Sequence, residues 1–246
     1  MPFWTYRGLS GGVVTASWPI EVPDGEAGMP VPTGVGCPDG CGVCVESCPS
    51  GAISGHPVLT VDHGACVSCN RCLESCPVGE LDASGPMIIA STTRQALRRT
   101  ADPAERAVFA PGSNPLRKSL FVRHIDCGSC NGCESEIGAL DNPYYNLHRF
   151  GIFFTPSPRF ADVLLVTGPV TIPMRDPLLA TYEAMPAPKL VIATGACAIS
   201  GGTNGGGYSA FDGIGGFLPV DLWIPGCPPH PVAVIDALLA ASGRSR

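Results

Sequence analysis

The chain has 246 residues and a formal net charge of −6, and 45% of its residues are hydrophobic. This length favours two domains, each of which can bury a core. The acidic balance and the scattered basic residues argue against a nucleic-acid partner, because binding to phosphates needs a cluster of positive side chains.

Two features of the sequence bear on its location. The longest apolar runs, such as 163–166 and 232–235, are far shorter than the roughly 18 residues that span a bilayer. The first residues lack the basic and apolar regions of a secretion signal, and they carry no twin-arginine motif. We therefore expect a cytoplasmic protein.

Thirteen cysteines are the most informative feature of the composition. In a chain without a secretion signal, cysteines serve metal binding or catalysis more often than disulfides. An odd number also disfavours complete pairing. The count therefore indicates metal clusters in a reducing compartment.

Two segments carry little periodic pattern. Residues 1–34 are expected to form an extended arm, in which Trp4 and Trp18 pack either against the arm's own domain or against a partner, since aromatic residues are enriched at interfaces. Residues 84–118 are expected to form a linker with one short helix at 91–99.

Residues 35–83 are expected to fold as an α+β ferredoxin-like domain with two iron–sulfur clusters. Its second half is Cys66-x2-Cys69-x2-Cys72-x3-Cys76-Pro77, the bacterial ferredoxin motif, in which three close thiolates bind one cluster and the fourth reaches the other. Between the two halves of this domain, residues 57–62 alternate as a strand does.

The first half of this domain repeats the motif with one difference. Three residues separate Cys37 from Cys41 where two are usual, and the turn-forming residues 38–40 can absorb the extra one. Crossed ligation then predicts one cluster on each of two sets. The first cysteine set is Cys37, Cys41, Cys44 and Cys76, and the second cysteine set is Cys66, Cys69, Cys72 and Cys48.

Residues 119–246 are expected to form an α/β domain with a mostly parallel sheet. Their apolar runs are continuous rather than alternating, as in a sheet that is covered on both faces. The expected strands are 120–125, 151–155, 162–167, 190–194 and 222–224, and the expected helices are 133–140, 176–184 and 231–241.

Cysteines near the ends of three expected strands predict one more cluster, because open α/β sheets bind ligands beyond the carboxyl ends of their strands. Cys130 and Cys133 follow one strand, and Cys197 and Cys227 lie in glycine-rich turns after two others. Cys127 competes for a place in this group. It lies nearer the strand, so a packed thiol beside the cluster is the better interpretation.

Five motifs of this domain point to a known family. They are DCGSCNGCE at 126–134, TPSPR at 155–159, TGPVT at 167–171, GAC at 195–197 and PGCPP at 225–229. Together they resemble the small subunit of membrane-bound, energy-converting nickel–iron hydrogenases, including formate hydrogenlyase, and its relative in respiratory complex I. The amino-terminal part is similar to the ferredoxin-like subunit of the same complexes, so the resemblance implies two subunits fused in one chain.

The resemblance implies a flavodoxin-like domain that holds a proximal 4Fe-4S cluster against a large subunit. By motif match the ligands of this cluster, the third cysteine set, are Cys130, Cys133, Cys197 and Cys227. The nickel–iron centre belongs to the large subunit, so this chain is expected to supply no nickel ligand. The glycines within 201–207 have no P-loop lysine beside them and are interpreted as a flexible loop.

Glu134 follows the Cys130 and Cys133 pair directly. A carboxylate in this place could relay protons, or it could be a solvated or helix-capping acid near a helix N-terminus. His124 and His230 also lie near the third cysteine set, and we expect both to be structural residues rather than ligands.

The sequence therefore predicts an electron-transfer subunit with three 4Fe-4S clusters, which is not catalytic alone and serves a nickel–iron large subunit. Partner subunits would hold it on the inner face of the cell membrane. A complex I-type module that reduces quinone is the alternative within this architecture. The Cys130-x2-Cys133 spacing favours the hydrogenase, because complex I relatives carry adjacent cysteines at this motif. A zinc-stabilised interaction module is the alternative of another class, although zinc sites ordinarily use two cysteine pairs a dozen or more residues apart.

Overall fold

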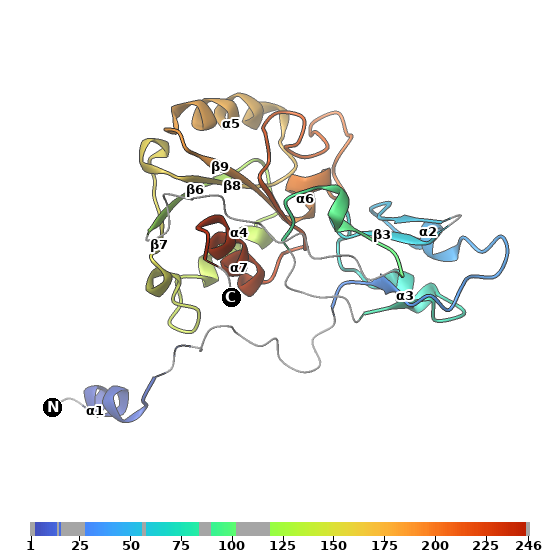
Figure 1. The fold of residues 1–246 in the computed structure, drawn as a ribbon, viewed down its shortest axis with the longest axis horizontal. Helices are drawn as coiled ribbons and strands as arrows, with labels where there is room; N and C mark the ends of the chain where they lie inside the picture. The colour runs from blue at the N-terminus through green and yellow to red at the C-terminus, as the bar shows by residue number, and fades with distance from the viewer. Residues whose placement is uncertain are drawn as a thin grey trace.

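The computed structural model describes residues 3–13, 15, 28–55, 58–83, 90–101 and 119–244. An α/β body and a smaller cysteine-rich part lie side by side, and residues 90–99 run where the two parts meet (Figure 1). No helix among these described residues is both long enough and apolar enough to cross a membrane.

The amino-terminal segment was expected to be extended, but part of it is helical. Residues Phe3–Ser10 form helix α1, in which no residue is buried. In Figure 1 this helix lies away from the rest of the described chain, and Trp4 is 75% exposed. Trp4 is therefore not buried against the described parts of the chain, and Trp18 lies outside the described residues.

The cysteine-rich part consists of two short helices and two small antiparallel sheets. Its elements are β1 (Val31–Pro32), α2 (Val43–Ser47), β2 (Ile53–Ser54), β3 (Thr60–Asp62), α3 (Arg71–Ser75), β4 (Leu81–Asp82) and β5 (Arg98–Arg99). One sheet pairs β1 with β4, and the other has the order β2-β3-β5. Each helix comes from one half of the sequence repeat and is followed directly by a cysteine, Cys48 or Cys76, in an extended conformation.

The prediction of a helix at 91–99 is wrong for most of these residues. A single 3-10 turn, η1 (Gln95–Leu97), is followed by β5, which pairs with β3. Leu97 is fully buried in this turn, and the two arginines that follow it pair with Val61 and Asp62 of β3. Tertiary pairing therefore overrides the local preference for helix, as is common for short segments.

The five strands expected in the α/β domain are confirmed. They are β6 (Leu120–Asp126), β7 (Ile152–Phe154), β8 (Val163–Thr167), β9 (Leu190–Thr194) and β10 (Leu222–Ile224). All pair in parallel in the order β7-β6-β8-β9-β10, which is 2-1-3-4-5 when the strands are counted along the chain. This is the flavodoxin-like order, and its ligand-binding crevice lies where the order reverses, at the carboxyl ends of β6 and β8.

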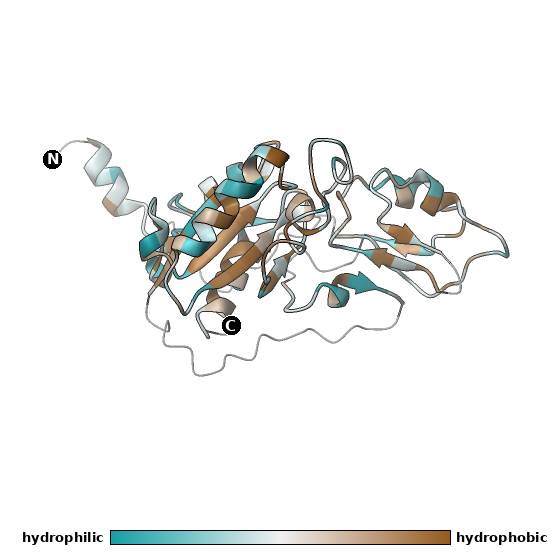
Figure 2. Ribbon diagram, turned by 90° about the horizontal axis from the view of Figure 1, so that it is seen from above, coloured by the Kyte–Doolittle hydropathy of each residue, from teal (hydrophilic) through white to brown (hydrophobic). Residues whose placement is uncertain are grey.

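Helices cover both faces of this sheet, and every residue of the central strand β8 is buried. The helices are α4 (Gly132–Ala139), α5 (Ile172–Ala184), α6 (Gly195–Ser200) and α7 (Pro231–Ala241). Packing of α4 and α7 buries one face, and packing of α5 and α6 buries the other. The sheet strands are accordingly brown in the hydropathy view of Figure 2.

Two helices differ from the expectation. Helix α5 begins at Ile172 rather than 176, because Pro173 is tolerated in the first turn, where a backbone N–H has no helical acceptor. The residues around Cys197 were expected to form a glycine-rich turn, but they form the short helix α6, which starts at Gly195 with φ of +87°. Cys197 therefore lies in a helix and not in a loop.

The cysteine-rich part and the α/β domain share one hydrophobic core. Ala52, Ala65 and Leu97 belong to the same buried cluster as Ile199 of α6 and Trp223 of β10. A second, smaller core lies wholly inside the cysteine-rich part. Because buried side chains cross from one part to the other, the two parts pack as one body.

Candidate metal centres

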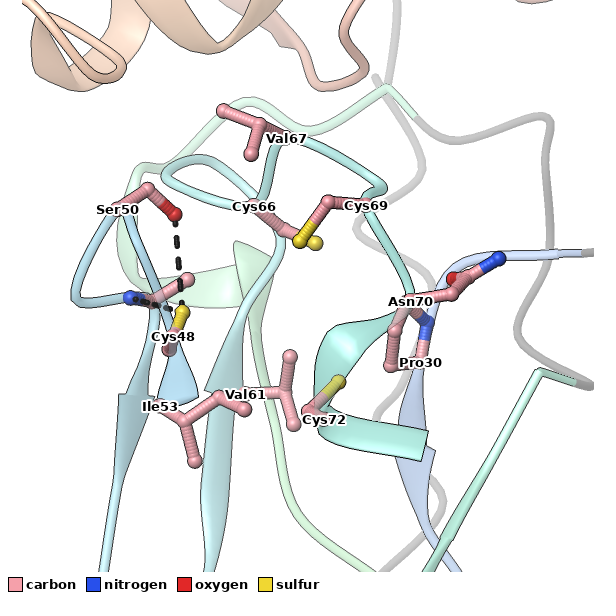
Figure 3. Close-up of a pocket in the computed structure, with 11 residues that line it drawn as sticks. Pro30, Cys48, Ser50, Ile53, Val61, Cys66, Val67, Cys69, Asn70 and Cys72 are labelled. Carbon is pink, nitrogen blue, oxygen red and sulfur yellow. Dashed lines mark hydrogen bonds between the residues drawn. The ribbon is translucent and has the colours of Figure 1, made fainter. Parts of the chain in front are cut away.

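The four cysteines of the second cysteine set line one pocket. Cys66 and Cys69 come from the loop after β3, Cys72 lies in α3, and Cys48 follows α2. Figure 3 shows their sulfurs directed toward a common space, whose remaining lining is mostly apolar. Four converging thiols in an apolar pocket fit an iron–sulfur cluster, because such clusters are held by soft thiolate ligands. Within the described ranges, no three His, Cys, Asp or Glu side chains are grouped so that they could hold a single metal ion.

The first cysteine set also comes together, and it too takes one member from the opposite half of the repeat. Burial raises the pKa of Cys44, and the nearby charges of Cys37 and Cys76 raise it further. The pKa of Cys37 is raised by burial first and then by neighbouring charges that include Cys41 and Cys76. Glu80 joins the two halves, because its backbone N–H lies 3.2 Å from Cys76 Sγ and its carboxylate accepts from Gly36 N at 2.7 Å. Cys76 therefore lies near the segment that leads into Cys37, as crossed ligation requires.

Backbone N–H groups point at sulfurs in both sets. The pairs, with N to Sγ distances, are Ala52 to Cys48 at 3.3 Å, Ser68 to Cys66 at 3.4 Å and Glu80 to Cys76 at 3.2 Å. For Cys76, burial alone would raise the pKa, but the surrounding backbone N–H groups outweigh burial and lower it. Such donors stabilise a thiolate and are one means by which a protein tunes a cluster's reduction potential.

Glu80 is a buried acid whose contacts the sequence did not reveal. It is only 4% exposed, and its carboxylate accepts hydrogen bonds from the backbone N–H of Gly36 at 2.7 Å and of Gly34 at 3.2 Å. The hydroxyl of Thr33 lies 3.4 Å from the same carboxylate. Glu80 thereby holds the segment that leads into Cys37, where the spacing departs from the usual motif. A single acid after a Cys-Pro pair gives no pattern from which this role could be predicted.

The third cysteine set gathers at the carboxyl ends of the parallel strands. Cys130 and Cys133 follow β6, Cys197 lies in α6 after β9, and Cys227 follows β10. Burial raises the pKa of Cys133 to about 12, and the charges of Glu134 and of the other three cysteines act in the same direction. Buried thiols that repel one another as anions become thiolates readily only when a metal supplies positive charge, so this set also fits a cluster.

Glycines leave room for the sulfurs of the third set. A β-carbon on Gly195 would lie 2.7 Å from the Sγ of Cys133, and one on Gly202 would lie 2.9 Å from the Sγ of Cys197. Both glycines have positive φ, at +87° and +59°. The glycine-rich loop at 201–207, which the sequence did not connect with any site, therefore packs beside the third cysteine set.

Cys127 occupies a different environment from the third set. It is fully buried and belongs to the hydrophobic core that α5 and α6 share. Its backbone N–H donates to Thr167 O at 2.8 Å, and its carbonyl accepts from Thr171 N at 2.9 Å. Burial, followed by the charge of Asp126, raises the pKa of its thiol to about 12. These contacts match a packed thiol next to the site.

Glu134 lies in the first turn of α4, at the crevice between β6 and β8. Its carboxylate accepts hydrogen bonds from Ser129 Oγ at 2.5 Å and from Thr167 Oγ1. His124 Nε2 lies 3.6 Å from this carboxylate and 3.0 Å from Thr167 Oγ1. Burial lowers the pKa of His124 despite the nearby Glu134 and Asp126. His230, by contrast, caps helix α7 through a 3.2 Å bond from Val232 N to its Nδ1.

The second cysteine set borders the shared core through Cys66. Cys66 is buried with core residues of the α/β domain. The pKa of Cys66 is raised by burial first, and also by charges that include Cys48, Cys69 and Cys227. Ile199 of α6 and Trp223 of β10 belong to the same buried cluster as Cys66, so Cys66 packs with the elements that carry Cys197 and lead into Cys227.

Family models match both parts of the chain. Residues 130–241 match the family described as the 20 kDa subunit of NADH ubiquinone oxidoreductase, and residues 37–80 match a 4Fe-4S dicluster domain. Together the two matched segments contain all twelve cysteines of the three sets. The matches establish iron–sulfur chemistry for this chain, without giving the number of clusters.

Curated relatives belong to several redox complexes. Formate hydrogenlyase subunit 7 of Escherichia coli is 43% identical over 58% of this chain and 56% of its own length, so the chain spans little more than half of that relative. A probable membrane-bound hydrogenase subunit of Pyrococcus furiosus is 43% identical over 51% of this chain and 75% of its own length. Subunit K of the NAD(P)H-quinone oxidoreductase of Picosynechococcus is 47% identical over 44% of each chain. The chain belongs to the family of the 20 kDa subunit of NADH ubiquinone oxidoreductase, whose members include these hydrogenase subunits, and it carries a 4Fe-4S dicluster domain before the family domain.

Proposed function

We propose that this chain is the electron-transfer subunit of a multi-subunit, membrane-associated oxidoreductase. It would bind three 4Fe-4S clusters, one on each cysteine set, and its cysteine-rich part would be a ferredoxin-like α+β domain. The repeated unit of a short helix followed by an extended cysteine supports the ferredoxin-like assignment. Clusters held by these thiolates would supply one-electron redox chemistry.

The observation that carries this proposal is the burial of Cys66 in the same core cluster as Ile199 of α6 and Trp223 of β10. It joins the second set to the third, and the exchange of Cys48 and Cys76 between the halves of the repeat joins the first set to the second. The order along the molecule is therefore first set, second set, third set. A row of three sites suits a relay.

The protein's own residues prepare these sites for electron transfer. The apolar lining around Cys48, Cys66, Cys69 and Cys72 excludes water, so backbone N–H groups and charges act there with little screening. The N–H donors to Cys48, Cys66 and Cys76 favour the thiolate form and lower the cost of placing negative charge inside the protein.

The exposed side of the third cysteine set is where we expect a partner subunit to bind. Cys130 and Cys227 are exposed, although the other two cysteines of the set are at least partly buried. Two relatives are named as subunits of a formate hydrogenlyase and of a membrane-bound hydrogenase. We therefore propose a nickel–iron large subunit as the partner that covers this side, and peripheral attachment to the inner face of the membrane through partner subunits.

Glu134 is proposed as a proton-relay residue beside the third set. Two hydroxyls, from Ser129 and Thr167, hold its carboxylate, and Thr167 connects it to His124. A carboxylate positioned by hydroxyl groups can exchange a proton along the hydrogen bonds that position it. The helix-capping alternative places the same acid in the first turn of α4, where a negative charge favours the helix.

A complex I-like module that reduces quinone is the second candidate. One relative is named as a subunit of an NAD(P)H-quinone oxidoreductase, and it is 47% identical over 44% of this chain, compared with 43% over 58% for the formate hydrogenlyase subunit. The partner decides between the two functions. A large subunit with two Cys-x2-Cys pairs for nickel supports the hydrogenase, and a large subunit without them supports quinone reduction.

Metal analysis of the anaerobically purified chain tests the number of clusters in the proposed relay. Three 4Fe-4S clusters require about twelve iron atoms and about twelve acid-labile sulfides per chain. A value of about eight iron atoms would contradict the third cluster or the assignment of Cys37. A colourless protein that contains zinc would instead support an interaction module without redox function.

A further inference from the structure

Residues 90–99 contact both parts of the chain near their cysteines. Ser91 and Trp223 exchange two backbone hydrogen bonds, from Ser91 N to Trp223 O at 3.0 Å and from Trp223 N to Ser91 O at 2.8 Å. Both residues are buried, with Ser91 only 3% exposed. Trp223 lies on β10, which leads into Cys227. One end of the segment is therefore fixed to the strand that carries a member of the third cysteine set.

The same segment is fixed to the second cysteine set through Arg94. Its guanidinium donates two hydrogen bonds of 2.6 Å to the two carboxylate oxygens of Asp62. Asp62 in turn shapes the loop that carries Cys66, since its Oδ1 accepts from Gly64 N at 2.9 Å and its carbonyl accepts from Cys66 N at 3.0 Å. Paired, planar contacts of this kind fix orientation as well as distance.

Gly64 lets both Arg94 and helix α6 approach the loop that carries Cys66. A β-carbon on Gly64 would lie 2.7 Å from Arg94 Nη1 and 2.8 Å from Ile199 Cγ2. Ile199 is buried in α6, two residues after Cys197. The guanidinium of Arg94 and the helix that carries Cys197 therefore both press on the loop that carries Cys66.

Given that the second and third cysteine sets hold clusters, as proposed above, we propose that residues 90–99 form a strap that sets the separation of these two sites. Arg94 is the positioning residue of this strap. Its guanidinium binds Asp62 and packs at Gly64, and through these two residues it acts on the Cys66 loop. The Ser91 to Trp223 bridge anchors the strap on the side of the third set. Because electron transfer weakens steeply with separation, a fixed strap keeps the relay fast between the two parts of the chain.

Two variants disturb the contact from opposite sides. Arg94→Met keeps an unbranched chain against Gly64 but removes the bond to Asp62. Gly64→Ala keeps Arg94 but forces it and Ile199 away from the loop. The matched controls are Arg98→Met, whose side chain is 68% exposed and lies 4.0 Å from Asp62, and Gly55→Ala, where the nearest atom to an added β-carbon would be 3.7 Å away.

The readout is electron paramagnetic resonance of the fully reduced, metal-loaded chain, together with its iron content. In the wild type we expect a magnetic interaction between the clusters of the second and third sets. Arg94→Met and Gly64→Ala should lose at least half of this splitting with iron content unchanged, and both controls should keep it. Wild-type splitting in both test variants would overturn the strap. Loss of iron in both test variants, with iron kept in the controls, would also overturn it. The contact would then be needed to bind a cluster and not to set the separation of two clusters.

Hydrogen exchange of the metal-free chain tests the role of Arg94 independently of any cluster. The backbone N–H groups of Ala65 and Cys66 both bond to Asp62 O, at 3.1 and 3.0 Å. We expect Arg94→Met to speed their exchange at least tenfold in the metal-free chain, while Arg98→Met leaves it unchanged. Equal exchange in the two variants would overturn the proposed role of Arg94. A wild-type chain that binds no iron would contradict the proposed function instead. The exchange measurement would still test whether Arg94 holds the Cys66 loop.

Discussion

No side chain fits between Gly195 and Cys133, because a β-carbon on Gly195 would lie only 2.7 Å from the Sγ of Cys133. The φ of Gly195, +87°, also disfavours any other residue. We expect Gly195→Ala to push the sulfur away from its set and to lower the iron content from about twelve to about eight atoms per chain. Iron analysis of the anaerobic protein measures this change.

Gly138→Ala is the matched control for this substitution. Gly138 lies in α4, the helix that carries Cys133, and an added β-carbon there would have no atom within 4 Å. Because alanine favours helix over glycine by roughly 0.5–1 kcal/mol, the control should keep its iron and unfold at a slightly higher temperature. Equal iron contents in Gly195→Ala and Gly138→Ala would contradict the packing described for the third set.

Glu80→Gln should weaken the first cysteine set in particular. The substitution replaces a buried acceptor of two backbone N–H bonds with an amide that can accept them at only one of its two terminal atoms. The lost bond should cost about 1–3 kcal/mol in the free energy of unfolding, and the loop before Cys37 should release its cluster. Chemical denaturation and iron analysis test both effects. The exposed Glu74→Gln on α3 is the control, and a loss of iron as large in that variant would contradict the role of Glu80.

The sequence predicted the sheet and the grouping of the cysteines well, for a physical reason. Continuous apolar runs such as Val163–Thr167 are typical of buried parallel strands, and parallel strands present their carboxyl ends together. Cys197 and Cys227 could therefore be expected side by side although 29 residues lie between them. The close cysteine spacings similarly predicted the first two sets, since short spacers restrict which thiols can meet.

Long-range contacts that leave no local pattern could not be predicted. Residues 91–99 have the composition of a short helix, but their conformation is decided by pairing of β5 with β3 and by the bridge of Ser91 to Trp223. Glu80 reaches Gly36 across 44 positions of sequence, and nothing near either residue indicates the bond. Tertiary partners of this kind override local propensity.

Cys127→Ala should leave the metal sites intact. Cys127 is fully buried in the core, so loss of its sulfur should cost about 1–2 kcal/mol in the free energy of unfolding through the cavity it leaves. Iron content should stay at the wild-type value, whereas Cys130→Ser should lose about four iron atoms. An equal loss of iron in the two variants would make Cys127 a ligand and contradict the assignment of the third set.

Stability should fall at acidic pH because of His63. This residue is fully buried, and its Nε2 lies 2.8 Å from the carbonyl oxygen of Pro30. Burial lowers its pKa below the ordinary value of 6.5, so the unfolded chain binds a proton at a higher pH than the folded chain does. The contribution of neutral His63 is complete above pH 6.5 and is lost as the pH falls toward the folded pKa, by up to about 1.4 kcal/mol per pH unit.

Denaturation of the metal-loaded chain between pH 5.5 and 7.5 measures this dependence. His63→Gln should have a flatter dependence than the wild type, because Gln carries no titrating group. The half-exposed His148→Gln keeps His63 and should retain the wild-type slope. A His63→Gln slope equal to that of the wild type would contradict a neutral, buried His63.

The order of the relay is tested most directly by comparing Cys76→Ser with Cys48→Ser in the reduced, metal-loaded chain. Cys76→Ser should remove the cluster of the first set and leave the magnetic interaction between the second and third sets. Cys48→Ser should remove the second cluster and abolish that interaction, although both variants lose about four iron atoms. This difference in electron paramagnetic resonance is the predicted result. The opposite result, with the interaction lost in Cys76→Ser and kept in Cys48→Ser, would contradict both the crossed ligation and the row of three sites.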